Sequence, residues 1–284
     1  MTAIQSLLAG LFDYAGLYPP AALSLRSAAN NYLDYARDRH SSALGRFIIN
    51  ADRIDELRST VGDRLQEIKL SVIVSESNSL DAISNAMKDG LAIEALEIKS
   101  VQLEAMERIA AEIPQSLITY VEVPFDSRFL DSLEVISRLG MRAKIRMGGV
   151  VAEAFPPVSQ VVSMLKTFVM LRIPFKATAG LHHPIRSTQS LTYEPQSQKE
   201  TMHGFINLCC AAAVLNFGGE EKDAEGVLRE EDRSAWAFAP DALQWRHLKW
   251  TRDQLSLLRR EFFISIGSCS FEEPIRDLEA LGWL

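Results

Sequence analysis

The sequence has few cysteines, no excess of positive charge and no long apolar run. Its three cysteines, Cys209, Cys210 and Cys269, are too few for a disulfide framework and suit a reducing cytoplasm. Its 30 basic and 37 acidic side chains give a formal net charge of −7, which does not attract a nucleic-acid backbone. No apolar run approaches the roughly 20 residues that cross a bilayer, and the N-terminus lacks a basic signal-peptide start. We therefore expect a cytoplasmic protein that binds neither nucleic acid nor membrane.

Signatures of nucleotide and metal binding are also missing. No G-x-G-x-x-G follows a β-rich run, and no G-x-x-x-x-G-K-[ST] occurs. No spacing of histidines, cysteines and carboxylates matches a known closed metal site. We therefore expect no cofactor and no resident metal.

What the sequence does contain is a regular alternation of β-rich runs and helical stretches. The chain has 284 residues, of which 47% are hydrophobic, as in ordinary globular proteins. Strands separated by helices pair in parallel, and eight such units favour closure into a barrel. The fold class predicted is a single α/β domain over residues 1–284, a (β/α)8 TIM-type barrel. Its strands are expected at 11–16, 46–50, 69–74, 95–100, 118–123, 142–147, 175–180 and 262–267.

One connection is much longer than the others. Residues 186–261, between the seventh and eighth strands, include a polar loop, a helix expected from about 200 to 216 and a charged segment. Insertions of this length are usually functional or flexible, so we expect a lid over the barrel. Apolar residues on its helix could also form an interface between copies, which leaves a homo-oligomer possible. After the eighth strand, Ser270 and Glu273 form a capping-box pattern that predicts a final helix.

Strand side chains alternate between the two faces of a sheet, which assigns charged residues to the inside of the barrel. In the fourth to seventh strands the apolar positions must face the helices, so Glu97, Glu122, Lys144 and Lys176 point inward. Asp13, Asn50 and Thr178 are placed inward near strand ends by the same rule. Buried charges must be paired or hydrated. We therefore expect them to line the barrel mouth, where sites of this architecture lie; the alternative is an ion-pair network that only fills the space.

Two inward lysines on neighbouring strands suggest imine chemistry. A partly desolvated lysine among other cations has a depressed pKa, which frees its amine to attack carbonyl groups. Lys144 has Arg146 two residues on and Lys176 on the adjacent strand, so Lys144, or failing that Lys176, is the expected nucleophile. Glu122 or Glu97 would carry protons. Arg146 would bind the carboxylate or phosphate of a small anionic carbonyl substrate.

At these residues the chain resembles the deoxyribose-phosphate aldolase group of class I aldolase barrels. That group carries K-x-x-x-G on the sixth strand and K-A-x-x-G on the seventh; this chain has Lys144-Ile-Arg-Met-Gly148 and Lys176-Ala-Thr-Ala-Gly180. The resemblance, over about forty residues, implies an imine on Lys144 that is tuned by Lys176, in a lyase. Arg146 and Met147 depart from the small hydroxylated residues of that pattern.

Further candidates lie in loops at the strand ends. Gly148 and Gly149 permit close approach of a ligand to the backbone, and Ser268 precedes a helix N-terminus that could bind phosphate. His182 and His183 follow the seventh strand and could contact substrate. An alternative enzyme is a metal-assisted acid/base catalyst using Glu97, Glu122 and His183. A second alternative is a barrel that binds a small anion without catalysis. Cys269 precedes the final helix, where a thiolate is favoured, but no base is adjacent in sequence.

Overall fold

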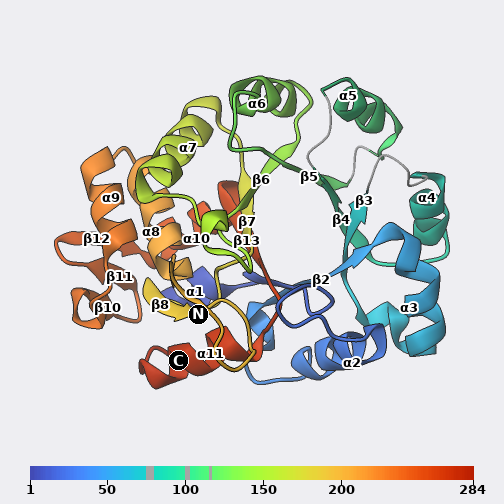
Figure 1. Cartoon of the computed structure of the whole chain (residues 1–284), viewed down its shortest axis with the longest axis horizontal. Coiled ribbons are helices and arrows are strands. Elements are labelled where there is room, and N and C mark those ends of the chain that lie inside the picture. Colours follow the sequence, from blue (N-terminus) through green and yellow to red (C-terminus); the bar gives the residue numbers. More distant parts are fainter. Residues whose placement is uncertain (75–79, 100–102, 115–116) are drawn as a thin grey trace.

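The chain forms the predicted closed barrel. A computed structural model describes residues 1–74, 80–99, 103–114 and 117–284. Eight strands pair in parallel around the barrel in the order β1-β13-β7-β6-β5-β4-β3-β2 (Figure 1). They are β1 (Phe12–Tyr14), β2 (Leu44–Asn50), β3 (Leu70–Val74), β4 (Ile93–Ile98), β5 (Ile118–Glu122), β6 (Arg142–Arg146), β7 (Phe175–Thr178) and β13 (Phe263–Ser268). The TIM-type fold and all eight expected strands are confirmed, with small shifts at the strand ends.

Helices surround the barrel and cover the apolar faces of its strands (Figure 1). They are α2 (Leu25–Tyr35), α3 (Ile54–Val61), α4 (Leu80–Lys88), α5 (Leu103–Glu112), α6 (Phe129–Arg138), α7 (Val158–Leu171) and α11 (Glu272–Ala280). Ala143 and Ile145 of β6 are fully buried against this layer, as the alternation predicts. Short 3-10 helices lie in the connections: η1 (Ser41–Ala43), η2 (Ala51–Arg53), η3 (Gly62–Glu67), η4 (Ala152–Ala154) and η5 (Arg233–Ala235).

One segment is long and apolar enough to cross a membrane by length and composition alone. It comprises residues Ala152–Leu171, and 39% of its apolar 18-residue stretch is buried inside the protein. Its α-helical part, α7, packs on the barrel: Phe168 is fully buried and its ring centroid lies 5.2 Å from that of Phe175 in β7. Core helices of globular proteins meet the same criteria, so this feature is weak support for a membrane span.

The long connection between β7 and β13 contains two small sheets as well as helices. Its elements are β8 (Ser187–Ser190), β9 (Lys199–Met202), α8 (Phe205–Asn216), α9 (Glu221–Arg229), β10 (Trp236–Phe238), β11 (Ala242–Trp245), β12 (Leu248–Thr251) and α10 (Arg252–Glu261). The helix expected from about residue 200 begins only at Phe205, because β9 pairs antiparallel with β8. Trp236, Trp245 and Trp250 lie in the three-stranded sheet β10-β11-β12.

Helix α8 belongs to the outer layer of the barrel. It is apolar on all sides, and every residue from Phe205 to Leu215 is buried. It contacts α7, α9 and α10, and Phe205 packs edge-on against Phe12 of β1 with ring centroids 5.3 Å apart. Helix α8 thus packs on the barrel wall, and the lid expected from residues 186–261 stays a prediction. The N-terminal helix α1 (Ala3–Leu8) packs against α10 and β11.

The final helix begins near the predicted position. The backbone N–H of Glu273 donates to Ser270 Oγ at 3.1 Å, which is the first half of the expected capping box. The Glu273 carboxylate does not close the box but contacts His182 and Tyr193. This diversion places an acidic side chain at the rim of the barrel.

Candidate functional site

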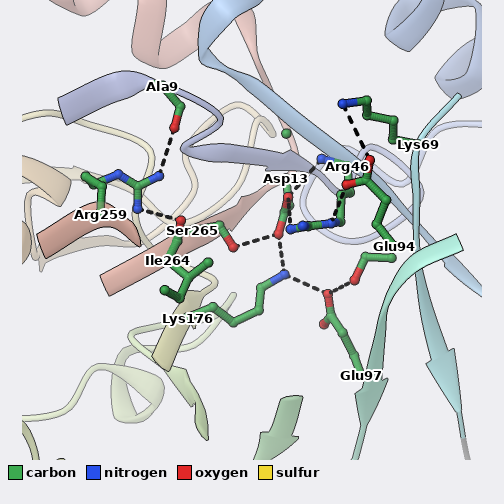
Figure 2. Close-up of polar contacts among 12 residues, drawn as sticks. Ala9, Asp13, Arg46, Lys69, Glu94, Glu97, Lys176, Arg259, Ile264 and Ser265 are labelled. Atoms are coloured by element: carbon green, nitrogen blue, oxygen red, sulfur yellow. Dashed lines mark hydrogen bonds and ion pairs between the residues drawn. The ribbon is translucent and has the colours of Figure 1, made fainter. Parts of the chain in front are cut away.

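Lys176 lies at the centre of a charged cluster inside the barrel. Its side chain is fully buried, and its Nζ donates to Asp13 Oδ2 at 2.6 Å and to Glu97 Oε1 at 2.7 Å (Figure 2). The Nζ also lies 5.3 Å from the ring centroid of Tyr120, within reach of a cation–π interaction. One ammonium group thus joins carboxylates from β1 and β4 across the barrel interior.

Each carboxylate around Lys176 is held by further donors. Asp13 Oδ2 accepts from Ser265 Oγ at 2.7 Å, and Asp13 Oδ1 accepts from the backbone N–H of Arg46 at 2.8 Å (Figure 2). Glu97 Oε1 accepts from Ser71 Oγ at 2.7 Å. A Cβ at Gly45 would lie 2.4 Å from Asp13 Oδ1, so only glycine leaves room for this carboxylate. Such satisfied buried networks hold their members rigidly.

Lys144 extends the cluster toward the barrel mouth. Its Nζ lies 2.9 Å from Glu97 Oε2 and 3.1 Å from Glu122 Oε2. Lys144 and Lys176 are register partners on adjacent strands, as are Glu122 and Lys144. The Lys144 side chain is 7% exposed and that of Glu122 is 20% exposed, against 0% for Lys176. The four predicted catalytic residues therefore meet in one cluster.

The electrostatics of this cluster differ from the sequence-based expectation. Burial alone would lower the pKa of Lys176, but Asp13 and Glu97 outweigh it and raise that pKa above its usual range. Burial would raise the pKa of Glu97, but Lys144 and Lys176 outweigh it and hold that pKa well below its usual range. The closest charged groups around each lysine are carboxylates, not the cations we expected. An imine on Lys176 is disfavoured by this pairing, because the attacking amine must be neutral.

An aromatic loop contributes to the barrel mouth near β2. Tyr18 follows β1 and its hydroxyl donates to Asn50 Oδ1 at 3.0 Å. The Tyr18 ring packs against Ala15, Ile48 and Ile73, a small apolar cluster separate from the main core. Burial and the nearby charge of Glu97 raise the pKa of the Tyr18 hydroxyl. Asn50 is thus a mouth residue, as predicted, but its side-chain oxygen is already bonded to Tyr18.

Arg146 and Thr178 lie at the ends of β6 and β7, where they are register partners. Arg146 is exposed. Thr178 is partly buried, and its hydroxyl would lie 2.7 Å from a Cβ placed on Gly267 of β13. Both positions agree with the predicted inward alternation, and Arg146 offers a guanidinium group to solvent.

The glycines after β6 serve packing more than ligand approach. A Cβ at Gly148 would lie 2.4 Å from the Phe155 ring and 2.9 Å from Gly180 Cα, so the space beside Gly148 is filled by the protein. Approach of a ligand to the Gly148 backbone stays a prediction, since this contact concerns only the space that a side chain would need. Gly149 and Gly180 instead border a small cavity with His182 and His183.

The remaining predicted residues lie at the rim beside β7 and β13, each with partners of its own. His183 Nδ1 contacts Asp277 Oδ2 at 2.6 Å, and His182 Nδ1 lies 3.3 Å from Glu273 Oε2. The Ser268 hydroxyl donates to the backbone oxygen of Ser270 at 2.6 Å, which ties it into its own turn. None of these contacts involves the lysine cluster.

Metal binding receives no geometric support from the part of the chain that the structure describes. Within residues 1–74, 80–99, 103–114 and 117–284, no three or more histidine, cysteine or acidic side chains are arranged to hold a metal ion. The two glutamates of the metal-assisted alternative contact Lys144, whereas His183 contacts Asp277.

Sequence reasoning missed two side chains that organise the cluster. Ser71 is a hydroxyl within the apolar run of β3 and bonds Glu97; its inward position follows from the same alternation. Arg46 lies 3.9 Å from Asp13 through Nη1 and 3.1 Å from Glu94 through Nε. The sequence did offer one signal for Arg46, because a charged side chain within a predicted strand must find a partner or reach solvent.

Comparisons with known proteins add little to this geometry. No protein-family model and no curated protein matches the chain. A solved structure of phospho-2-dehydro-3-deoxyheptonate aldolase from Francisella tularensis SCHU S4 aligns with 80% of this chain and 90% of its own, at 8% identity and a TM-score of 0.37. A likeness this loose carries no argument about function. The barrel is established by its own strand pairing.

Proposed function

We propose that this protein is a class I aldolase-like lyase that forms an imine between Lys144 and a small anionic carbonyl compound. The observation that carries the proposal is the gradient along one chain of charges. Asp13, Lys176 and Glu97 are fully enclosed, whereas Lys144 and Glu122 lie at the partly exposed end of the same chain. Among these five described side chains, Lys144 and Glu122 are the two most exposed, and sites of this architecture lie at the C-terminal ends of the strands.

Glu122 is the base that this geometry assigns to Lys144. An ammonium group must lose a proton before it attacks a carbonyl carbon. Glu97 is a poor acceptor, because the two lysines hold its pKa well below the usual range. Glu122 lies 3.1 Å from the Lys144 Nζ and does not contact Lys176 in the described network. Glu122 would therefore accept the proton that leaves Lys144.

The same pair serves the later steps. The neutral amine adds to the carbonyl carbon, and water leaves after its oxygen is protonated by Glu122, giving the imine. The Glu122 carboxylate then takes the proton of the substrate's β-hydroxyl as the carbon–carbon bond breaks, and the bond's electrons form an enamine. Protonation of the enamine and hydrolysis of the imine return free Lys144.

The anionic group of the substrate would be bound by Arg146. Its guanidinium lies exposed at the end of β6, two residues after Lys144 on the same strand. A planar guanidinium binds carboxylate or phosphate through two parallel hydrogen bonds. Tyr18 and Asn50 would border the site on the opposite side, at the ends of β1 and β2.

The complete pairing of the cluster favours one alternative, a barrel that binds an anion without catalysis. Borohydride reduction separates the two. Incubation with pyruvate, 2-oxobutyrate or dihydroxyacetone phosphate, followed by reduction, should add the reduced carbonyl mass to the intact protein. Lys144→Met should abolish the adduct, and Lys166→Met, which removes a half-exposed lysine from α7, should retain it. Binding of these compounds without any adduct would contradict the lyase and support the alternative.

A further inference from the structure

A second group of reactive side chains lies at the barrel rim beside β7 and β13. Cys269 follows β13, His182 follows β7, Tyr193 lies between β8 and β9, and Glu273 lies in the first turn of α11. Four segments that are distant in sequence thus meet at one point. None of these residues has a part in the lysine chemistry proposed above.

The contacts place a thiol next to a base. Cys269 Sγ lies 3.9 Å from His182 Nδ1 and 3.8 Å from the Tyr193 hydroxyl. Glu273 Oε2 lies 3.3 Å from the same histidine nitrogen and 3.1 Å from the Tyr193 hydroxyl. One imidazole nitrogen thus lies near both the thiol and a carboxylate, so it can take the thiol proton and hold it between Sγ and Glu273.

His182 is suited to hold the proton of this thiol. Burial alone would lower the pKa of its imidazole, but Cys269 and Glu273 outweigh burial and raise that pKa to about 10. The proton that His182 takes from Cys269 is therefore held as an imidazolium between Sγ and Glu273. This is the same Glu273 carboxylate that does not close the capping box of α11.

The other two cysteines provide a natural contrast. Cys209 and Cys210 lie in α8 with 0% exposure, and burial raises the pKa of both thiols. Cys269 is 5% exposed. His182, Tyr193 and Glu273 also border a cavity of about 20 Å³, which is room for one water-sized molecule. A very small reactant could therefore be held beside His182.

We propose that Cys269 is a modification site for hydrogen peroxide, with His182 as its base. The thiol proton passes to His182, Sγ attacks one peroxide oxygen and the O–O bond breaks. The departing oxygen takes the proton from His182 and leaves as water. The sulfur loses two electrons and becomes a sulfenic acid, while the peroxide is reduced.

The test treats the full-length protein with hydrogen peroxide, traps sulfenic acid with dimedone and locates the label by peptide mass spectrometry. The label is expected on Cys269 and not on Cys209 or Cys210. His182→Asn should slow labelling by at least about 10-fold, because the base is lost. His247→Asn is the matched control and should leave the rate unchanged, since His247 lies exposed between β11 and β12 and does not border this cavity. Equal labelling of all three cysteines, or an unchanged rate in His182→Asn, would overturn the proposal.

A second measurement needs no variant and so does not depend on folding of the mutants. The rate with tert-butyl hydroperoxide should be much lower than with hydrogen peroxide, because its bulky alkyl group fits poorly into a cavity of about 20 Å³. Equal rates would refute the assigned reactant. Labelling should persist in Lys144→Met, which separates this site from the lysine cluster.

Discussion

Lys176 and Lys144 are the same residue type, opposite each other on adjacent strands, yet they occupy different environments. Lys176 lies deep in the barrel between Asp13 and Glu97, while Lys144 lies at the mouth between Glu97 and Glu122. Glu97 joins the two ammonium groups. If the proposed function holds, burial and charge partners, and not residue type, separate a lysine that supports the fold from one that reacts.

Replacing Lys176 should have the largest effect on stability. Lys176→Met leaves Asp13 and Glu97 facing each other without their shared counterion, and breaking a buried ion pair typically costs about 3–5 kcal/mol. Urea unfolding followed by circular dichroism measures the change in the free energy of unfolding. A loss below that of Lys144→Met would contradict the assigned structural role of Lys176.

Replacing Lys144 should separate chemistry from stability. Lys144→Met should abolish the borohydride adduct while lowering the free energy of unfolding by only about 1–3 kcal/mol, since Glu97 keeps Lys176 as a partner. Intact mass and urea unfolding of the same sample give both values. An unchanged adduct would show that another lysine reacts.

Removing a single neutral donor should have a smaller effect. Ser265→Ala deletes the hydroxyl that donates to Asp13 Oδ2, and losing one buried hydrogen bond costs about 1–2 kcal/mol. The adduct on Lys144 should still form. Ser163→Ala, at an exposed position of α7, is a control for the substitution itself and should not change the urea midpoint.

Acid should weaken the cluster in a defined direction. Because the folded pKa of Glu97 is lowered, its stabilising contribution is complete above its unfolded pKa of about 4.5 and is lost as pH falls toward the folded value. Because the folded pKa of Lys176 is raised, its contribution is complete below about pH 10.5 and declines above it. Glu97→Gln should flatten the fall in the urea midpoint below pH 4.5. An equally steep fall of the urea midpoint in that variant would show that groups other than Glu97 cause the acid sensitivity.

The sequence was sufficient to place the charged residues inside the barrel, because the two-residue alternation of strands is fixed by the pleat. Asp13, Glu97, Glu122, Lys144 and Lys176 all point where alternation puts them. The pairing could not be predicted, because Glu97 reaches Lys176 across the interior, from β4 to β7. A neighbour in sequence would be a poor guide, because Lys99, two residues after Glu97 in the chain, is exposed.

The insertion shows the limits of sequence patterns more clearly. Its two small sheets are built from antiparallel strands of only three or four residues, too short for a reliable alternation signal. The meeting of His182, Tyr193, Cys269 and Glu273 depends on how these strands fold back over the rim, so no spacing in the sequence indicates it.

The location of the reduced adduct tests the central claim most directly. After reduction with borohydride in the presence of an α-keto acid, proteolysis and tandem mass spectrometry identify the modified lysine. The account predicts that the carbonyl carbon is attached to Lys144 Nζ and that Lys176 stays unmodified. Attachment to Lys176 would contradict it.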